Sequence, residues 1–296
     1  MLSRRNLKDR IAAAGAALVA ALPPLLVLAL AAALLRKSWP ILASRPLAAL
    51  LFSSSWHPQQ GQFGFYPFIV GTLWVTALAM AFTIPICLLT AIYLSEYASA
   101  RVRAAAKPVT DLLAGIPPVV YGLWGVLAVV PLVSGIGAAS GRATTGYAVL
   151  SGAVVLAIMV SPIIISVCVE VMAAVPPEAR DASLSLGATR WETVKHVVLR
   201  RVASGIVAAV VLGFSRAFGE TMAVLMVVGN VPKPPHSVFD AAYPLPALIA
   251  NNYGEMMSIP LYDSALLLAA LILLVVVLAF NVAATLVLHR VEGSTA

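Results

Sequence analysis

Residues 213–230, GFSRAFGETMAVLMVVGN, place two opposite charges inside an otherwise apolar stretch that extends from residue 206 to residue 229. Arg216 and Glu220 are four residues apart, so on a continuous helix they would share one face. A charge at membrane depth costs roughly 2.5–3.5 kcal/mol on insertion scales, and such residues usually pair inside a bundle or line an ion path. The stretch therefore predicts a membrane span that carries either an ion pathway or a buried ion pair.

The composition of the whole chain indicates a polytopic membrane protein. Hydrophobic residues make up 61% of the 296 residues and charged residues 10%, whereas a soluble domain has about 25% charged residues. The mean hydropathy is +0.98. The net charge of +7 comes from basic residues at the ends of apolar segments, which favours membrane orientation over a nucleic-acid partner.

Six apolar segments have the length needed to cross a bilayer. They are residues 11–35, 68–94, 109–134, 147–170, 204–228 and 264–288. With the N-terminus inside, thirteen of the 19 Lys and Arg residues lie on inner segments and five on outer loops. This bias predicts that both termini are cytoplasmic. The first segment is longer than the roughly 7–15-residue apolar region of a signal peptide, so we expect a retained membrane anchor.

The expected organisation is a single membrane domain with short tails. We expect a cytoplasmic N-terminus over 1–10, a transmembrane domain over 11–288 and a cytoplasmic tail over 289–296, with long outer loops at 36–67 and 229–263. Cys87 and Cys168 lie within apolar runs and are expected to be packing residues. The four histidines lack the spacing of metal ligands, so neither a metal site nor a catalytic site is predicted.

The inner loop over 171–203 has the pattern of two short amphipathic helices. Prolines precede Glu178, as at a common helix start, and helical spacing then breaks at Gly187 before it resumes from Trp191. Two helices joined at a glycine would form a compact knob on the inner face. An interfacial hairpin that lies on anionic lipid is the alternative interpretation, because the segment is also rich in Arg and Lys.

The motifs of this loop and of its neighbours resemble a known family. Permeases of ATP-binding-cassette importers carry an inner loop with an EAA…G pattern, and here Asp181-Ala182-Ser183 is followed by Gly187. Leu199-Arg200 stands where the family usually has Leu-Pro, which is a departure at the end of the loop helix. Five motifs are similar to the phosphate-specific permease subunits of the PstC type: FGFYPFIVGTLWVTALA, AIYLSEYA, LLAGIPPVVYG, LGATRWETV and RAFGETMAV.

The resemblance covers roughly residues 61–288 and implies an all-α, type I-like importer permease fold of about six transmembrane helices in the bacterial plasma (inner) membrane. It also implies four kinds of partner besides membrane lipid: a PstA-type permease, two ATP-binding-cassette ATPase subunits, an extracytoplasmic phosphate-binding protein and inorganic phosphate. The chain has no G-x-x-x-x-G-K-[ST] loop, so no ATP or other cofactor is expected on it. By the family pattern, the residues that contact the ATPase are Glu178, Asp181, Ala182 and Gly187.

The candidate phosphate pathway consists of Arg216 and Glu220, flanked by Ser215 and Thr221. The planar fork of arginine suits phosphate oxygens, and a carboxylate on the same face would neutralise it between transport cycles. A static ion pair that only fixes helix packing is the alternative. Thr72, Thr76 and Asn281 are expected to be interhelical contacts, and Glu96, Asp111 and Glu170 to be solvated near the inner span ends.

Three other functions remain open from the residues alone. The same architecture could serve another oxyanion or take the PstA role. A secondary anion transporter could use a proton gradient through Glu220. A membrane sensor or scaffold would need the charged pair only for packing.

Overall fold

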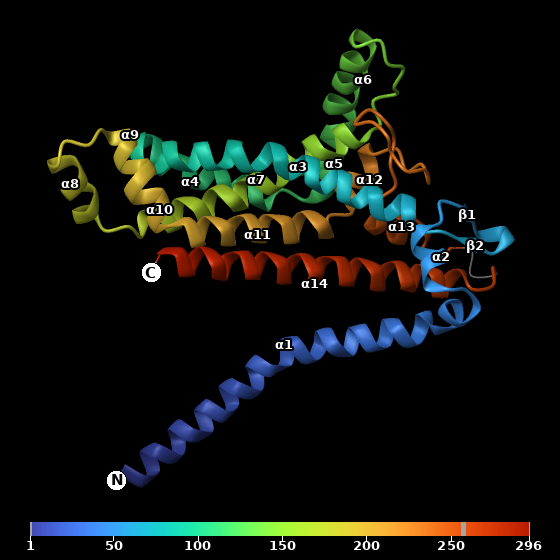
Figure 1. Cartoon of the computed structure of the whole chain (residues 1–296), viewed down its shortest axis with the longest axis horizontal. Coiled ribbons are helices and arrows are strands. Elements are labelled where there is room, and N and C mark those ends of the chain that lie inside the picture. Colours follow the sequence, from blue (N-terminus) through green and yellow to red (C-terminus); the bar gives the residue numbers. More distant parts are fainter. Residues whose placement is uncertain (1, 256–258, 296) are drawn as a thin grey trace.

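Long apolar helices run side by side along the long axis of the molecule (Figure 1). The computed structural model describes residues 2–255 and 259–295. Helix α7 (Val149–Ala173) packs against α3 (Tyr66–Ile92) and α11 (Ala203–Gly219), and α11 also packs against α14 (Tyr262–Thr295). The predicted segments 68–94, 147–170 and 264–288 therefore each form a membrane-length helix. Within the described ranges, five helices are long and apolar enough to span a membrane, or six if one bent pair is counted.

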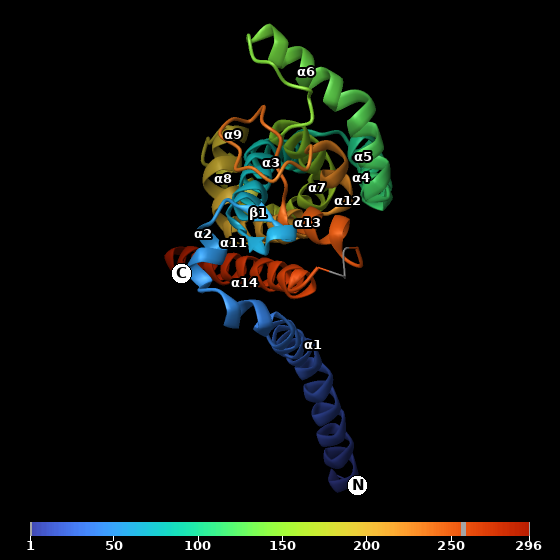
Figure 2. The same ribbon diagram turned by 90° about the vertical axis from the view of Figure 1, so that its right-hand side faces the viewer.

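Helix α1 (Leu2–Ser44) is longer than the predicted first span and lies at the margin of the bundle. Its C-terminal part contacts α14, and its N-terminal part diverges from the bundle (Figures 1 and 2). The apolar helical segment covers Ala12–Ser44, so the expected outer loop 36–67 begins about nine residues later than predicted. The sequence placed the boundary at Arg36-Lys37, but long basic side chains do not interrupt a helix near a membrane surface.

Both outer loops are structured. After α2 (Leu47–Phe52), the strands β1 (Trp56–His57) and β2 (Gln62–Phe63) form an antiparallel hairpin around the 3₁₀ turn Pro58–Gln60. The ring of Trp56 lies 4.8 Å from that of Phe68 on α3 and 6.4 Å from that of Tyr262 on α14. The loop 229–263 contains α13 (Leu245–Asn252). Residues 256–258 of this loop lie outside the described residues, as do Met1 and Ala296 in the expected tails.

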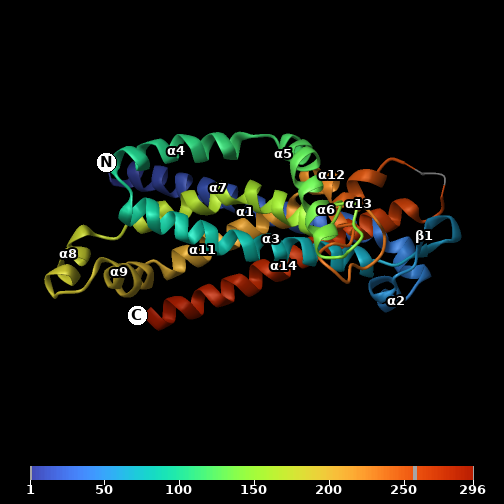
Figure 3. The ribbon, with the colours of Figure 1, turned by 90° about the horizontal axis from the view of Figure 1, so that it is seen from above.

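The predicted third span, 109–134, is wrong in its boundaries. Residues 100–115 form a separate amphipathic helix, α4 (Ala100–Gly115), which lies along α7 (Figure 3). Ile116 and Pro117 are extended, because a residue that precedes proline disfavours the helical region. The membrane-length segment is Pro118–Ala139, composed of α5 (Pro118–Trp124), the π-helical turn Gly125–Val129 and α6 (Val130–Ala139).

The close approach of α11 to α7 depends on glycine, as small residues commonly allow in membrane bundles. A Cβ atom added at Gly213 would lie 2.4 Å from Ile164 Cδ1 and 2.8 Å from Ile164 Cγ1. We expect Gly213→Val to destabilise the protein by about 1–3 kcal/mol through overpacking. Thermal unfolding of the detergent-solubilised protein measures this effect. Gly15→Val is the matched control, because nothing lies within 4 Å of that position; equal melting temperatures for the two variants would contradict the packing assignment.

Candidate functional site

The segment that carries Arg216 and Glu220 is broken in the structure. Helix α11 ends at Gly219, Glu220 is extended with φ −72° and ψ 125°, and α12 (Met222–Val227) begins two residues later. The predicted continuous span over 204–228 is therefore wrong, and the two charges do not share one helical face. Among the side chains that the structure describes, Arg216 and Glu220 form no ion pair.

Each of the two charges instead lies at a helix end that favours its sign. Arg216 is exposed in the last turn of α11, where the helix dipole favours a cation. Glu220 Oε1 accepts a hydrogen bond of 3.1 Å from the backbone N–H of Ala223 in the first turn of α12. A carboxylate at that position satisfies an N–H group that has no partner within the helix. The local chemistry thus stabilises the break instead of a closed ion pair.

The two polar residues beside the pair have different environments. The Ser215 hydroxyl lies 2.7 Å from Asn281 Oδ1 on α14 and 3.0 Å from the carbonyl oxygen of Val211. Ser215 and Asn281 therefore join α11 to α14, which is the interhelical role expected of Asn281. The Thr221 hydroxyl makes only a local contact of 3.3 Å with the carbonyl oxygen of Gly219.

Glu220 lines a small void together with Thr72 and Thr76 of α3. The void has a volume of about 10 Å³, and its other walls come from α7, α11, α12 and the segment around Pro244 and Pro246. This is roughly the space that one water needs and too little for a tetrahedral oxyanion. The Thr72 hydroxyl accepts a hydrogen bond of 2.8 Å from the backbone N–H of Leu245, so α3 also holds the start of α13. The space beside Glu220 therefore does not accommodate a phosphate ion in this structure.

The inner loop forms the predicted pair of short helices. Helix α8 (Pro177–Ser185) begins with a proline in its first turn, and Gly187 has a φ of +87°, a conformation that favours glycine. Helix α9 (Arg190–Thr193) follows, continues through the π-helical turn Val194–Val198, and leads through α10 (Leu199–Arg201) into α11. We call residues 177–193 the knob. It extends beyond one end of the bundle along the long axis (Figures 1 and 3).

The candidate ATPase contacts lie on the surface of the knob. Glu178, Asp181, Ala182 and Gly187 are all exposed. They lie beside exposed apolar side chains, of which Leu186 is 90% exposed and Trp191 51%. An exposed apolar patch with a charged rim is typical of a protein-binding surface.

A capping box fixes the start of α9. The Thr189 hydroxyl accepts a hydrogen bond from the backbone N–H of Glu192, and the Glu192 carboxylate accepts one of 2.8 Å from the backbone N–H of Thr189. The hydrogen bonds from the Thr189 backbone and hydroxyl hold the pKa of Glu192 below its usual value. The cap therefore stays ionised at neutral pH.

Glu96 makes a contact that the sequence did not predict. It was expected to be solvated, but it is 8% exposed and pairs with Arg180 of α8 at 2.8 Å. The two residues are 84 positions apart, so no helical or strand period connects them. An acidic residue at the end of an apolar span, in the motif AIYLSEYA, was the only available signal.

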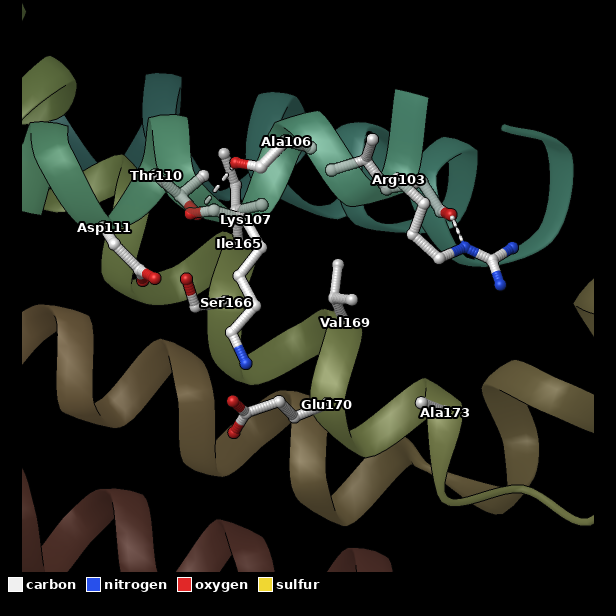
Figure 4. Close-up of a pocket in the computed structure, with 11 residues that line it drawn as sticks. Arg103, Ala106, Lys107, Thr110, Asp111, Ile165, Ser166, Val169, Glu170 and Ala173 are labelled. Atoms are coloured by element: carbon white, nitrogen blue, oxygen red, sulfur yellow. Dashed lines mark hydrogen bonds between the residues drawn. The ribbon is translucent and has the colours of Figure 1, made fainter. Parts of the chain in front are cut away.

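A groove of about 250 Å³ lies between α4 and α7 (Figure 4). The Lys107 ammonium points toward the Glu170 carboxylate, and Asp111 and Ser166 lie on the same side of the groove. Asp111 and Glu170 are exposed, as predicted. Arg103 also lines the groove, and its guanidinium donates to the carbonyl oxygens of Leu94 and Ser95.

Comparison with known proteins agrees with this architecture. Residues 84–293 match the family described as "Binding-protein-dependent transport system inner membrane component". The chain belongs to this family. It is therefore an inner-membrane component of a binding-protein-dependent transport system, with several helices of membrane-spanning length.

Individual relatives confirm the resemblance to PstC-type permeases. The chain is 34% identical over 259 residues to the phosphate transport system permease protein PstC of Xylella fastidiosa (strain 9a5c). The aligned region covers 82% of this chain and 79% of that protein. This chain is also 38% identical over 207 residues to the probable ABC transporter permease protein YqgH of Bacillus subtilis (strain 168). That aligned region covers 69% of this chain and 66% of the relative.

Solved structures confirm the importer-permease fold. An inward-facing conformation of the MetNI methionine ABC transporter matches with a TM-score of 0.55 and 20% identity, over 75% of this permease and 93% of that chain. A bacterial alginate ABC transporter in complex with its periplasmic protein matches with a TM-score of 0.52 and 16% identity, over 74% and 76% of the two chains.

Proposed function

We propose that this permease is the PstC-type subunit of an ATP-driven importer of inorganic phosphate, and that phosphate passes the break between α11 and α12. The observation that carries the proposal is this break, which puts Arg216 at the end of one half-helix and Glu220 at the start of the next. Irregular backbone at membrane depth is tolerated where it is buried in protein or lines a cavity, and transporters place such breaks at substrate sites. The similarity to PstC permeases supports phosphate as the anion.

The proposed complex supplies the parts that this chain lacks. One of two ATP-binding-cassette ATPase subunits docks on the knob, a PstA-type permease completes the pathway, and an extracytoplasmic phosphate-binding protein delivers the ion. The permease itself is not an enzyme and carries no cofactor, because ATP binds to the ATPase subunits. Exposed apolar side chains on the α5–α6 segment, such as Leu127 and Leu132, support a surface covered by the second permease or by lipid.

We propose that the knob and both termini are cytoplasmic. The bias of Lys and Arg toward the inner segments supports this orientation. The N- and C-terminal ends of the chain lie toward the same end of the bundle as α8 (Figures 1 and 3). The knob also projects along the bundle axis, which suits docking of a cytoplasmic subunit better than a hairpin that lies flat on lipid.

The proposed mechanism is alternating access between a closed and an open pathway. The void of about 10 Å³ beside Glu220 corresponds to a closed state. Closure of the ATPase subunits would bind one position of the knob more tightly than the other and so shift the bundle toward the open state. Helix α11, which follows the inner loop, extends about 20 Å from Ala203 to Arg216 at 1.5 Å per residue.

Reconstitution of the complete transporter in proteoliposomes tests the proposal. We expect ATP-dependent uptake of labelled phosphate in the presence of the binding protein, with much slower uptake of sulfate and molybdate. Faster uptake of sulfate or molybdate than of phosphate would show that the substrate is another oxyanion. Uptake that persists without the ATPase subunits would indicate a secondary transporter, and the absence of any flux would indicate a sensor or scaffold.

A further inference from the structure

An ion pair between the buried Glu96 carboxylate and the partly exposed Arg180 guanidinium connects the knob to the inner end of α3. Span two ends in the π-helical turn Tyr93–Tyr97, which contains Glu96. Arg180 Nε lies 3.2 Å from both carboxylate oxygens of Glu96, and Arg180 Nη2 lies 2.8 Å from Oε1. Among the described side chains, this is the one ion pair between an acidic and a basic residue. The bidentate geometry fixes direction as well as distance.

The same guanidinium also holds the end of α7. Arg180 Nη1 donates to the carbonyl oxygen of Val175 at 2.5 Å, and Nη2 donates to that of Met172 at 2.9 Å. Carbonyl groups at the end of a helix have no partner within it, so a cation that donates there replaces missing hydrogen bonds. One side chain of the knob thus binds the inner ends of α3 and α7 together.

A second arginine attaches α9 to the same turn. Arg190 donates to the backbone carbonyl oxygen of Glu96. Its guanidinium carbon also lies 5.0 Å from the centre of the Tyr97 ring, within the range of a cation–π interaction. Since the Ser183 and Thr193 hydroxyls, 3.0 Å apart, join the two short helices, α8 and α9 contact α3 as one unit.

The chain itself also connects the knob to the proposed pathway, through α10 and α11. That connection is bent, unlike the one through the contact with α3. The segment Arg190–Arg201 meets α11 at a bend of 70°, where Val202 leaves helical geometry with φ −105° and ψ 11°. Helix α3, in contrast, is one helix from Ile92 to Tyr66, with Pro85 inside it, and extends about 40 Å at 1.5 Å per residue. Its outer half carries Thr72 and Thr76, which line the void beside Glu220.

We infer that the Glu96–Arg180 pair, supported by Arg190, is the positioning contact that passes movement of the knob to α3 and so to the wall of the substrate pathway. Glu96 and Arg180 touch neither the substrate nor the ATP. They keep the knob at a fixed position on α3, so a displaced knob moves α3 with it. The inference rests on the proposed function, in which an ATPase subunit docks on the knob.

The test compares the complete wild-type transporter with two single variants, Glu96→Gln and Arg180→Gln. The amide keeps the size of the Glu96 side chain but removes its charge, so the rigid ion pair is lost. We expect the amount of phosphate transported per ATP hydrolysed to fall about 5-fold or more, the lower range of typical coupling between sites. The affinity of the ATPase subunits for the membrane complex should stay the same, because the exposed surface of the knob is unchanged.

Arg103→Gln is the matched control. Arg103 also holds the turn at the end of span two, with hydrogen bonds of 2.9 Å to Leu94 and 2.7 Å to Ser95, but it comes from α4 and not from the knob. It should leave the transport ratio at the wild-type value. If Glu96→Gln does not assemble, Arg190→Gln replaces it, because this exposed residue leaves no buried charge behind.

The outcomes separate this inference from the proposed function. An unchanged transport ratio in Glu96→Gln, or in Arg190→Gln where that replaces it, overturns the inference even if the melting temperature falls. An equal loss of the ratio in Arg103→Gln also overturns it, since the turn alone would then matter. Failure of the wild-type complex to bind ATPase subunits or to transport phosphate rejects the proposed function instead.

Discussion

Arg216→Gln is expected to lower phosphate uptake by the complete importer by about 10- to 100-fold. A hydrogen bond to a charged group contributes roughly 1.5–3 kcal/mol, and the loss of one such bond to phosphate corresponds to that decrease. Arg216 is exposed at the end of α11, beside the break in the span. Because Glu220 binds the backbone of α12, the guanidinium can meet an anion without first breaking an ion pair. The sequence had suggested a different mechanism, in which Arg216 pairs with Glu220 between transport cycles and with phosphate during transport.

Two further variants make the result specific to arginine at this position. Arg216→Lys keeps the charge but loses the planar fork, so it should retain an intermediate rate of uptake. Arg45→Gln is the matched control, because it removes the same charge from an exposed position near the outer end of α1. Uptake of labelled phosphate in proteoliposomes measures all three. Wild-type uptake by Arg216→Gln would show that the residue only supports the helix.

Glu220 stabilises the break between α11 and α12, whereas Arg216 can meet an anion. The sequence could not show this difference, because it did not predict the break. A run such as RAFGETMAV keeps helical spacing and high hydropathy on both sides of the glycine, so hydropathy predicts one continuous span. The break depends on a hydrogen bond between Glu220 and Ala223 and on the packing of α12 against α5 and α7. Such tertiary contacts outweigh local helix propensity.

The parts that the sequence predicted correctly are those with a local cause. Uniformly apolar segments predicted α3, α7 and α14, and the prolines before Glu178 with Gly187 predicted the two helices of the knob. The third span was misplaced because the apolar run continues across Pro117-Pro118, whereas these prolines separate one helix from the next. The contact of Glu96 with Arg180 has no local signal at all.

The position of the knob at the end of the bundle leads to the second large effect, which is expected for Asp181→Lys. Asp181 is exposed on α8, and its family pattern places it where importer permeases contact their ATPase subunits. Reversal of its charge puts a cation against a surface that accommodates an anion, and like charges at an interface can cost several kcal/mol. We expect ATP hydrolysis to become independent of the binding protein, and phosphate uptake to fall to background.

Asp111→Lys is the control for this charge reversal, because Asp111 is also exposed near the inner end of the bundle but lies on α4, away from the knob. Co-purification of the ATPase subunits and binding-protein-stimulated hydrolysis should both remain normal in this control. The comparison also distinguishes the knob from the Glu96–Arg180 contact behind it. Both changes uncouple hydrolysis from transport, but loss of docking at Asp181 also reduces the amount of ATPase bound, whereas loss of the ion pair leaves the ATPase bound. If Asp181→Lys keeps stimulated hydrolysis and uptake, Asp181 does not contact the ATPase.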